Sequence, residues 1–534
     1  MAAAVSALVL WGPFAQVATA APSGAETPAV SPTARGLTGI VGPDEVALSV
    51  IVPITAPATT TGLLDAEQLA QLTAPLGELS RTLDALDGVP VTLAIDPAIP
   101  ASVAALGSDA PTAAIDWVNR LSGWETFGLL YADADPTLLT QSSLGAVPAS
   151  AEPTGRWTPA ADGLILTSPD TVVASDIPKL ATHAPYGILV WSSQLADTEE
   201  ANAVAAVDRE RILIVDAEVS ARIGRAAANG TLTSVRTAID RDTIAVVDPA
   251  AAAGLRDVLT AIDADPRIAV VPLVAGISAA EVDDEGGKIA GAEVTIVDRP
   301  QDPERVAAFN RLVAEDALDA RFAQILDDPL SITAPDARRT LALASRAWVG
   351  DASWLQAIED ETRAAVERRG LVRIVESDSL FLADRSSLPV SIENGLDEPI
   401  TVDVRVKASN PRLDLADGAQ RATVAPDSQS TVHFDAVAVS NGTVRVTVTL
   451  TAPDGESIGH TAVASVNVQA GWETPIVLTA IGLLAALLVV GIIRTIRRNR
   501  RGHGAETSAI DQTGSSAATD ATAQPTGDTS DTDE

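Results

Sequence analysis

Cysteine is absent from the 534 residues of this chain. The absence excludes disulfide bonds, thiolate metal sites and a cysteine nucleophile. Without disulfides, each folded domain depends on a large apolar core. Because the chain is long and 46% of its residues are apolar, the sequence can supply such cores, and we expect two folded domains.

Histidine is also scarce, with four residues in the whole chain: His183, His433, His460 and His503. Only His183 falls in segment 45–370, which excludes a transition-metal site with two or three histidine ligands there. A Ca²⁺ or Mg²⁺ site made of carboxylates alone stays open. The patterns GxSxG, GxxxxGK[ST] and HExxH are missing too. We therefore expect no cofactor.

Basic residues are few: 36 Lys and Arg stand against 71 Asp and Glu, for a formal net charge of −35. This balance argues against a nucleic-acid partner, because phosphates need a basic patch. Such an excess of acidic residues ordinarily indicates a solvated acidic surface that keeps the protein soluble.

One apolar run is long enough to cross a membrane. Residues 475–493, PIVLTAIGLLAALLVVGII, are 19 residues without a charge. At about 1.5 Å per residue they roughly span a hydrocarbon core of about 30 Å. We predict a transmembrane helix over 474–493, then a basic stop-transfer segment and a disordered acidic cytoplasmic tail over 494–534. The residues that set this topology are Trp472, Arg494, Arg497, Arg498, Arg500 and Arg501.

The start of the chain has the character of an export signal. Residues 1–20 are predicted to be a signal peptide, because an apolar stretch closes on the small-x-small pattern Ala18-Thr19-Ala20. No basic residue precedes the stretch, so we expect the natural signal to begin further upstream. Residues 21–44 are expected to be a linker. With a single span near the other end, the folded domains are predicted to be extracellular and anchored in the cell membrane.

Segment 45–370 alternates strand-like and helix-like runs, which predicts an α/β fold with parallel crossovers. Leucines from Leu69 to Leu86 recur every three or four residues, as in an amphipathic helix kinked at Pro75. We expect a (β/α) barrel-like domain with a helical C-terminal part over 302–369, or else a doubly wound sheet. The expected strands are 46–52, 91–95, 127–132, 164–167, 187–191, 212–216, 243–248 and 267–274.

Segment 371–471 has a different period. Its runs PITVDVRV, TVHFDA and TVRVTVTL alternate apolar and polar residues, and turn signals such as Asn441-Gly442 separate them. Six or seven short antiparallel strands within about 100 residues predict an immunoglobulin-like β-sandwich. This domain would lie next to the membrane.

Acidic residues and one tryptophan stand at the ends of the expected strands, where parallel α/β folds bind their ligands. Paired carboxylates there would suit glycoside hydrolysis, and tryptophan would stack on a sugar. Capping explains the acidic residues as well, because Asp is a preferred N-cap and Pro suits the first helical position. We predict that Asp96 and Asp248 mainly cap helices, within a face that can bind a ligand. The candidate face consists of Asp96, Asp133, Asp135, Trp191, Asp216, Glu218 and Asp248.

The order of motifs adds a resemblance. VTLAIDP after a leucine-rich helix, then LPVSIEN, VNVQAGWETP, one span and an arginine-rich stop resemble an uncharacterised actinobacterial cell-envelope family, domain of unknown function 6049. The barrel region is similar to polysaccharide deacetylases. Asp96 stands where that family has an aspartate, but the metal-binding HxxxH pair is missing. Members of the envelope family are commonly encoded beside the lipid II flippase, so the resemblance implies a role in cell-wall assembly.

Two functions follow from these observations. The first is a membrane-anchored, non-catalytic binding or scaffold protein of the cell envelope, whose partner is a cell-wall glycan or a membrane protein of peptidoglycan synthesis. The second is a metal-independent glycoside hydrolase that acts through the strand-end carboxylates. The capping pattern and the missing histidines favour the first.

Overall fold

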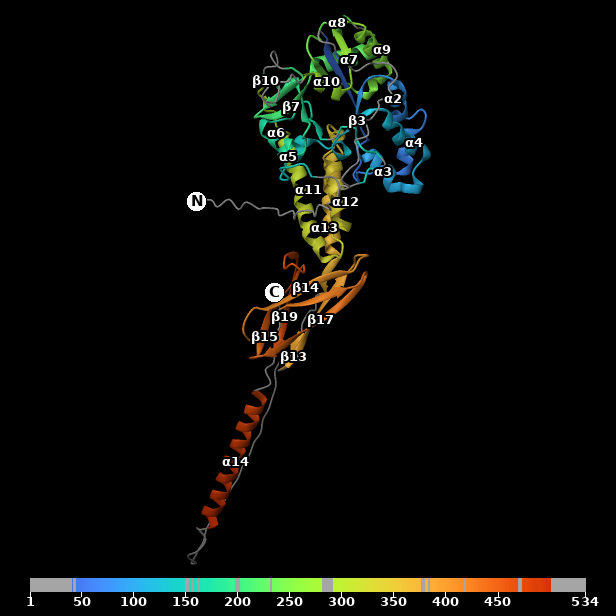
Figure 1. Cartoon of the computed structure of the whole chain (residues 1–534). Helices are drawn as coiled ribbons and strands as arrows, with labels where there is room; N and C mark the ends of the chain where they lie inside the picture. Colours follow the sequence, from blue (N-terminus) through green and yellow to red (C-terminus); the bar gives the residue numbers. More distant parts are fainter. Residues whose placement is uncertain are drawn as a thin grey trace, which may run out of the picture.

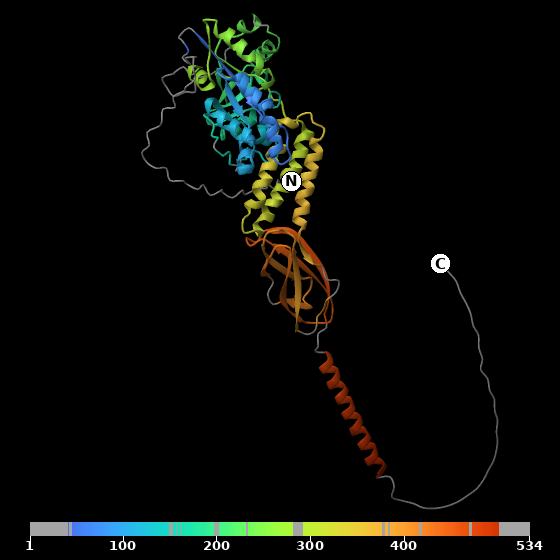
Figure 2. The same cartoon turned by 90° about the vertical axis from the view of Figure 1, so that its right-hand side faces the viewer.

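The computed structural model describes residues 41, 45–148, 153–155, 157–161, 163–196, 202–230, 233–280, 292–375, 380–382, 385–415, 419–468 and 473–500. The predicted signal peptide, nearly all of the linker and the tail beyond residue 500 lie outside them. Four parts follow one another along the molecule: an α/β part, three long helices, a β part and one apolar helix (Figures 1 and 2). The predicted order of an α/β part, a β part and a long apolar helix is confirmed.

A mostly parallel sheet forms the centre of the α/β part. Its main path runs β10-β6-β7-β8-β1-β2-β3, while β5 pairs with β4 and β7, and β9 pairs with β1. Among the described strands of this sheet, only β6 and β7 are antiparallel neighbours. The strands are β1 (Val46–Ile54), β2 (Thr92–Ile95), β3 (Glu125–Gly128), β4 (Leu164–Leu166), β5 (Gly187–Trp191), β6 (Val204–Val207), β7 (Glu210–Val215), β8 (Thr243–Val246), β9 (Ile268–Val270) and β10 (Ala292–Glu293).

The sheet curls around an apolar interior. Alternate residues of several strands join one buried cluster, which includes Ile51, Ala94, Phe127, Leu189 and Leu213. The residues between them face outward and pack under the helices. A single parallel bridge between Phe127 and Ala161 connects β3 to the segment before β4. Because side chains alternate along a strand, the inner face and the outer face are both buried.

Helices cover the outer face of the sheet (Figure 1), except α10 (Leu273–Ala280), whose residues Leu273 and Ile277 join the inner cluster. The predicted single helix over the leucine repeat is two helices, because Pro75 and Gly77 interrupt it. A side chain at position 77 would collide with the carbonyl oxygens of Gln71 and Leu72. The helices are α1 (Ala66–Thr73), α2 (Glu78–Leu86), α3 (Ala98–Leu106), α4 (Thr112–Arg120), α5 (Pro136–Gln141), α6 (Ile177–Ala181), α7 (Ala217–Asn229), α8 (Thr233–Arg236), α9 (Ala252–Asp263) and α10 (Leu273–Ala280).

Two predicted strands differ from the structure. The strand predicted over 127–132 ends at Gly128, and a short turn, Tyr131–Asp133, follows it. The strand predicted over 267–274 stops at Val270, and α10 begins at Leu273. Strand β6, which pairs with β10 and β7, was not predicted, because its turn into β7, Asp208-Arg209, contains neither Gly nor Asn.

Three long helices join the α/β part to the β part: α11 (Pro303–Phe322), α12 (Leu330–Leu343) and α13 (Trp354–Gly370) (Figures 1 and 2). The helical character of 302–369 is confirmed, and Pro335 lies inside α12. Charged side chains pack between these helices. Asp319 binds Arg368 and Arg369, and Asp336 binds Arg368 at 2.9 Å. This polar packing explains why the helices show no single apolar stripe.

Two antiparallel-rich sheets make up the immunoglobulin-like β part, with orders β11-β13-β17-β15 and β12-β19-β18-β14-β16. Their inner faces share a core with Phe322 and Ile332 of the long helices, so the helices pack directly on this part. The strands are β11 (Val372–Val375), β12 (Leu380–Leu382), β13 (Arg385–Asn394), β14 (Ile400–Ala408), β15 (Leu413–Leu415), β16 (Ala419–Val424), β17 (Ser428–Ala438), β18 (Gly442–Thr451) and β19 (Ser457–Val468).

One exposed apolar helix, α14 (Glu473–Arg500), extends away from the β part (Figure 2). Its segment Val477–Arg497 is long and apolar enough to cross a membrane, and none of its most apolar stretch is buried against the rest of the protein. Arg494 and Arg497 are exposed at its C-terminal end. Trp472 and Arg501 lie outside the described residues. The apolar helix is therefore as the sequence predicts, and it is weak support for a single membrane span.

Candidate strand-end site

Asp96 follows β2 and binds backbone from two segments. Its Oδ1 accepts the N–H of Ala98 at 2.8 Å, which caps α3. Its Oδ2 accepts the N–H of Ala56, after β1, at 3.2 Å. The side chain is 0% exposed. Asp96 therefore ties together the ends of the neighbouring strands β1 and β2 as well as starting a helix.

Asp133 lies in a strained turn beyond β3. Ala132 and Asp133 have φ of 55° and 52°, a left-handed conformation that costs free energy for residues other than glycine. The turn brings the Asp133 carboxylate onto Arg346, whose Nε lies 3.1 Å from both carboxylate oxygens. The terminal nitrogen of Arg346 donates to the same carboxylate. The strained backbone thus serves to form a buried ion pair.

Asp135 completes the cluster at the start of α5. Its Oδ1 accepts the N–H of Thr137 at 3.0 Å, and its Oδ2 accepts Nε2 of Gln301 at 2.5 Å. Its own N–H donates to the carbonyl oxygen of Ala344 at 2.9 Å. The segment after α12 therefore docks on the end of β3 by backbone bonds as well as through Arg346.

Burial dominates the electrostatics of the cluster. Loss of solvent, together with the nearby charge of Asp133, raises the pKa of Asp96 to about 7 against the opposing effect of its N–H donors. Burial also raises the pKa of Asp133, and Arg346 opposes that rise. For Arg346, burial disfavours the charge, but Asp133, Asp135 and Asp96 outweigh it and hold the pKa above its ordinary value. The positively charged Arg346 guanidinium therefore interacts with three carboxyl groups, those of Asp133, Asp135 and Asp96.

The other predicted residues lie in different surroundings. Asp216 caps α7 by accepting the N–H of Val219 at 2.8 Å, and Glu218 is exposed and paired with Arg222. Asp248 is exposed and accepts the N–H of Ala250 at 2.8 Å. Trp191 packs against the apolar interior and donates its Nε1 to the carbonyl oxygen of Thr167 at 3.0 Å. Of the predicted face, the structure brings Asp96, Asp133 and Asp135 together.

Sequence reasoning missed Arg346 and Gln301. Arg346 is 213 residues from Asp133 along the chain, and Gln301 is 166 residues from Asp135. Arg346 belongs to the segment 302–369 that was predicted to be helical, and Gln301 directly precedes that segment. A single arginine in SRAW carries no local pattern that could pair it with a distant aspartate.

The cluster is poorly arranged for acid–base catalysis. A hydrolytic pair needs two carboxyl groups that reach substrate on either side of a glycosidic bond. Here Asp96 is fully buried with its oxygens on backbone N–H groups, and Asp133 and Asp135 are held by Arg346 and Gln301. Among the described residues, no group of three or more His, Cys, Asp or Glu has the arrangement of a metal site. The three carboxyl groups therefore join segments of the chain to one another. In this conformation none of the three is free to contact a substrate.

Comparisons with known proteins give one family and several partial likenesses. The model of a family of unknown function, DUF6049, matches residues 187–524. No curated protein matches the chain. The solved structure of Escherichia coli alpha-2-macroglobulin is 21% identical over 18% of this chain and 6% of its own, with a TM-score of 0.15. Caenorhabditis elegans WR4, an MSP family member, is 10% identical over 18% of this chain and 98% of its own, also at 0.15. A PapD-like domain of human CEP192 is 10% identical over 19% and 84%, at 0.15.

Proposed function

Since this chain belongs to the DUF6049 family, whose function is unknown, we propose its function from its own geometry. It is a single-pass, membrane-anchored protein of the cell envelope that binds or scaffolds and catalyses no reaction. The observation that carries this proposal is the internal use of the strand-end carboxylates. A buried ion pair and backbone-bound carboxyl groups serve structure, because freeing them for a substrate would leave buried charge unpaired.

The ring of strands supports the finer description of the α/β part as an irregular (β/α) barrel. Its pairings follow the order β3-β2-β1-β8-β7-β5-β4, and the Phe127–Ala161 bridge lies where the ring would close. The shared interior cluster is what a small closed barrel contains. The sequence resemblance to polysaccharide deacetylases carries no metal site over to this barrel, because the HxxxH pair of that family is missing.

The membrane anchor supports a place at the cell surface. α14 is apolar and exposed, and arginines from Arg494 onward follow its apolar stretch. Positive residues accumulate on the cytoplasmic side of membrane helices, which puts the α/β and β parts outside. The β part then serves as a spacer between membrane and barrel. The partners of this arrangement are a cell-wall glycan or a membrane protein of peptidoglycan synthesis.

Protease treatment of intact protoplasts tests the orientation. We expect an added protease to digest the α/β and β parts and to leave a fragment that contains residues 494–534 protected, because the arginines hold that side in the cytoplasm. The control is the same treatment after detergent permeabilisation, in which the fragment should disappear. An α/β part that survives in intact protoplasts would contradict the orientation.

A further inference from the structure

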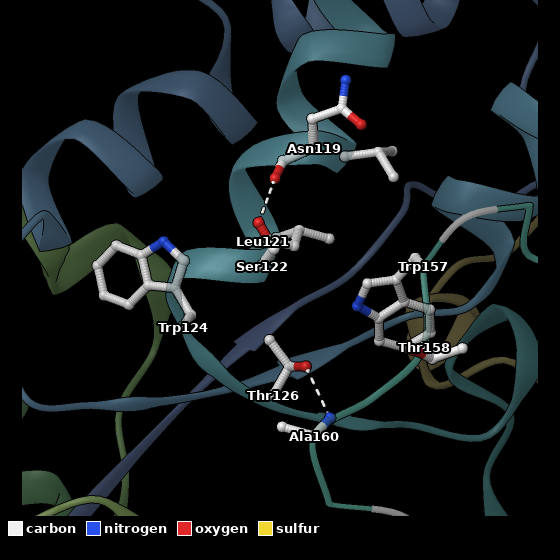
Figure 3. Close-up of a pocket in the computed structure, with 9 residues that line it drawn as sticks. Asn119, Leu121, Ser122, Trp124, Thr126, Trp157, Thr158 and Ala160 are labelled. Atoms are coloured by element: carbon white, nitrogen blue, oxygen red, sulfur yellow. Dashed lines mark hydrogen bonds between the residues drawn. The ribbon is translucent and has the colours of Figure 1, made fainter. Parts of the chain in front are cut away.

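A pocket lies on the flank of the barrel, and none of Asp96, Asp133 and Asp135 lines it. It opens between the end of α4, the start of β3 and the segment 157–160 (Figure 3). Its volume is about 240 Å³. The lining residues are Val118, Asn119, Leu121, Ser122, Trp124, Thr126, Trp157, Thr158 and Ala160.

The walls of this pocket are held in place. The N–H of Ala160 donates to the carbonyl oxygen of Thr126 at 2.9 Å and lies 3.3 Å from its hydroxyl oxygen, which fixes segment 157–160 on β3. Trp157 is 6% exposed and packs against the apolar core of the α/β part. Trp124 is half-buried and borders the pocket across from it (Figure 3). A preformed hollow with fixed aromatic walls is typical of small-molecule sites.

The chemistry of the lining selects an uncharged ligand. None of the nine side chains is ionisable, and the polar ones are hydroxyl and amide groups. Indole and aliphatic groups supply the rest. A phosphate, carboxylate or ammonium group would lose its hydration here without gaining a counter-charge. A sugar ring has apolar C–H faces that suit the indole and aliphatic groups of the lining. Its hydroxyl edges suit the hydroxyl and amide groups.

Trp157 adds an unmet hydrogen-bond donor. Its Nε1 is buried and has no partner among the described residues, although a buried indole N–H usually finds one. Figure 3 shows this nitrogen on the side of the ring that faces the hollow. The atom is shielded from bulk solvent. Satisfying that donor would favour binding of an oxygen-rich ligand.

The pocket has room for one ring. Since a water takes about 30 Å³, the volume corresponds to about eight waters. It falls below the roughly 300–1,000 Å³ of sites for drug-sized ligands. We propose that this pocket binds one uncharged pyranose ring, either as a free sugar or at the end of a glycan. The inference rests on the proposed binding function and names the class of ligand.

Sugar titrations of the full-length protein in lipid nanodiscs test this proposal. Saturation-transfer NMR with N-acetylglucosamine, glucose and glucuronate should show a Kd of about 1–10 mM for at least one neutral sugar, as expected for about 12–15 ligand atoms. Glucuronate should bind more weakly than glucose. Trp124→Ala should weaken binding at least about tenfold, and Trp157→Phe by about three- to tenfold, because it keeps a ring but loses the donor.

The matched control is Trp117→Phe. Trp117 also has a buried, unpartnered Nε1, but it does not line the pocket, so the same exchange there should leave sugar binding unchanged. Three results would overturn the proposal: no binding of either neutral sugar at about 50 mM, tighter binding of glucuronate, or binding that survives both pocket variants. Each of these leaves the protease result and the absence of catalysis untouched, so the two proposals fail separately.

Discussion

Replacing Asp96 with alanine should lower the free energy of unfolding of the α/β part by about 3–5 kcal/mol. The change leaves the N–H groups of Ala56 and Ala98 without their acceptor, and each buried unmet donor costs about 1–3 kcal/mol. Asp96→Asn should cost less, because the amide keeps one acceptor oxygen while its NH₂ group faces a backbone donor. The loss expected for Asp96→Ala exceeds the effect of losing a helix cap alone.

Asp248 is the matched control for this prediction. It caps in the same sequence context, but it is exposed and accepts a single N–H. Asp248→Ala should cost about 1 kcal/mol and Asp248→Asn almost nothing. Urea unfolding followed by tryptophan fluorescence reports the relevant part, because no tryptophan lies between residues 372 and 468. Equal losses in the two alanine variants would contradict a structural role of Asp96 beyond capping.

The loss at Asp96 should also depend on pH. Its folded-state pKa of about 7 lies above the ordinary 3.8, so the folded protein binds the proton more tightly than the unfolded chain. The stability gained from this proton is complete below about pH 3.8 and is lost as the pH rises through about 7. The difference between the parent and Asp96→Ala should therefore be larger at pH 5.5 than at pH 8, by on the order of 2 kcal/mol. A difference that grows toward pH 8 would contradict the raised pKa.

Replacing Arg346 with methionine should destabilise the α/β part by about 3–5 kcal/mol. The change leaves the Asp133 carboxylate buried, at 7% exposed, without the guanidinium that pairs with it. Breaking one side of a buried pair is costly, whereas removing both charges is much less so. The double variant Arg346→Met with Asp133→Asn should therefore recover most of the lost stability. Asn suits position 133, because it tolerates the left-handed backbone there.

The control for Arg346 is an exposed pair on the same part of the protein. Arg120 binds Asp84 at 2.6 Å, and both side chains are largely in solvent. Arg120→Met should cost less than about 1 kcal/mol, because exposed pairs contribute little. Urea midpoints of the three variants, taken side by side, separate these cases. A double variant less stable than Arg346→Met alone would show that the two side chains do not act as a pair.

Continuous apolar runs let the sequence place most of the parallel strands. GILVW and VTLAI form β5 and β2 almost as predicted, because strands buried on both faces need apolar residues at every position. The β6–β7 hairpin was missed for an equally physical reason. Its turn uses Asp208 and Arg209, with φ of 51° and 73°, where Asn and Gly are the usual signal. Tertiary packing holds a turn that local propensity would not predict.

The candidate site was partly predictable. Aspartates after apolar runs mark strand ends, and capping follows from Asp-Pro alone, so Asp135 and Asp248 were open to sequence reasoning as N-caps. The different surroundings of these aspartates could not be predicted from the sequence. Whether a strand-end carboxylate is buried, exposed or paired depends on chain segments far away, as Arg346 and Gln301 demonstrate for Asp133 and Asp135. The left-handed Ala132 carries no sequence signal either.

A turnover assay on the full-length protein tests the central claim, which is that the strand-end carboxylates are structural and the protein is not an enzyme. The purified protein in nanodiscs is incubated with peptidoglycan and arabinogalactan fragments, and new reducing ends are counted against protein-free samples. We predict no hydrolysis above that background from the parent. Hydrolysis by the parent that both Asp96→Asn and Asp133→Asn abolish, while each variant keeps its unfolding midpoint, would contradict the account and make these carboxylates catalytic.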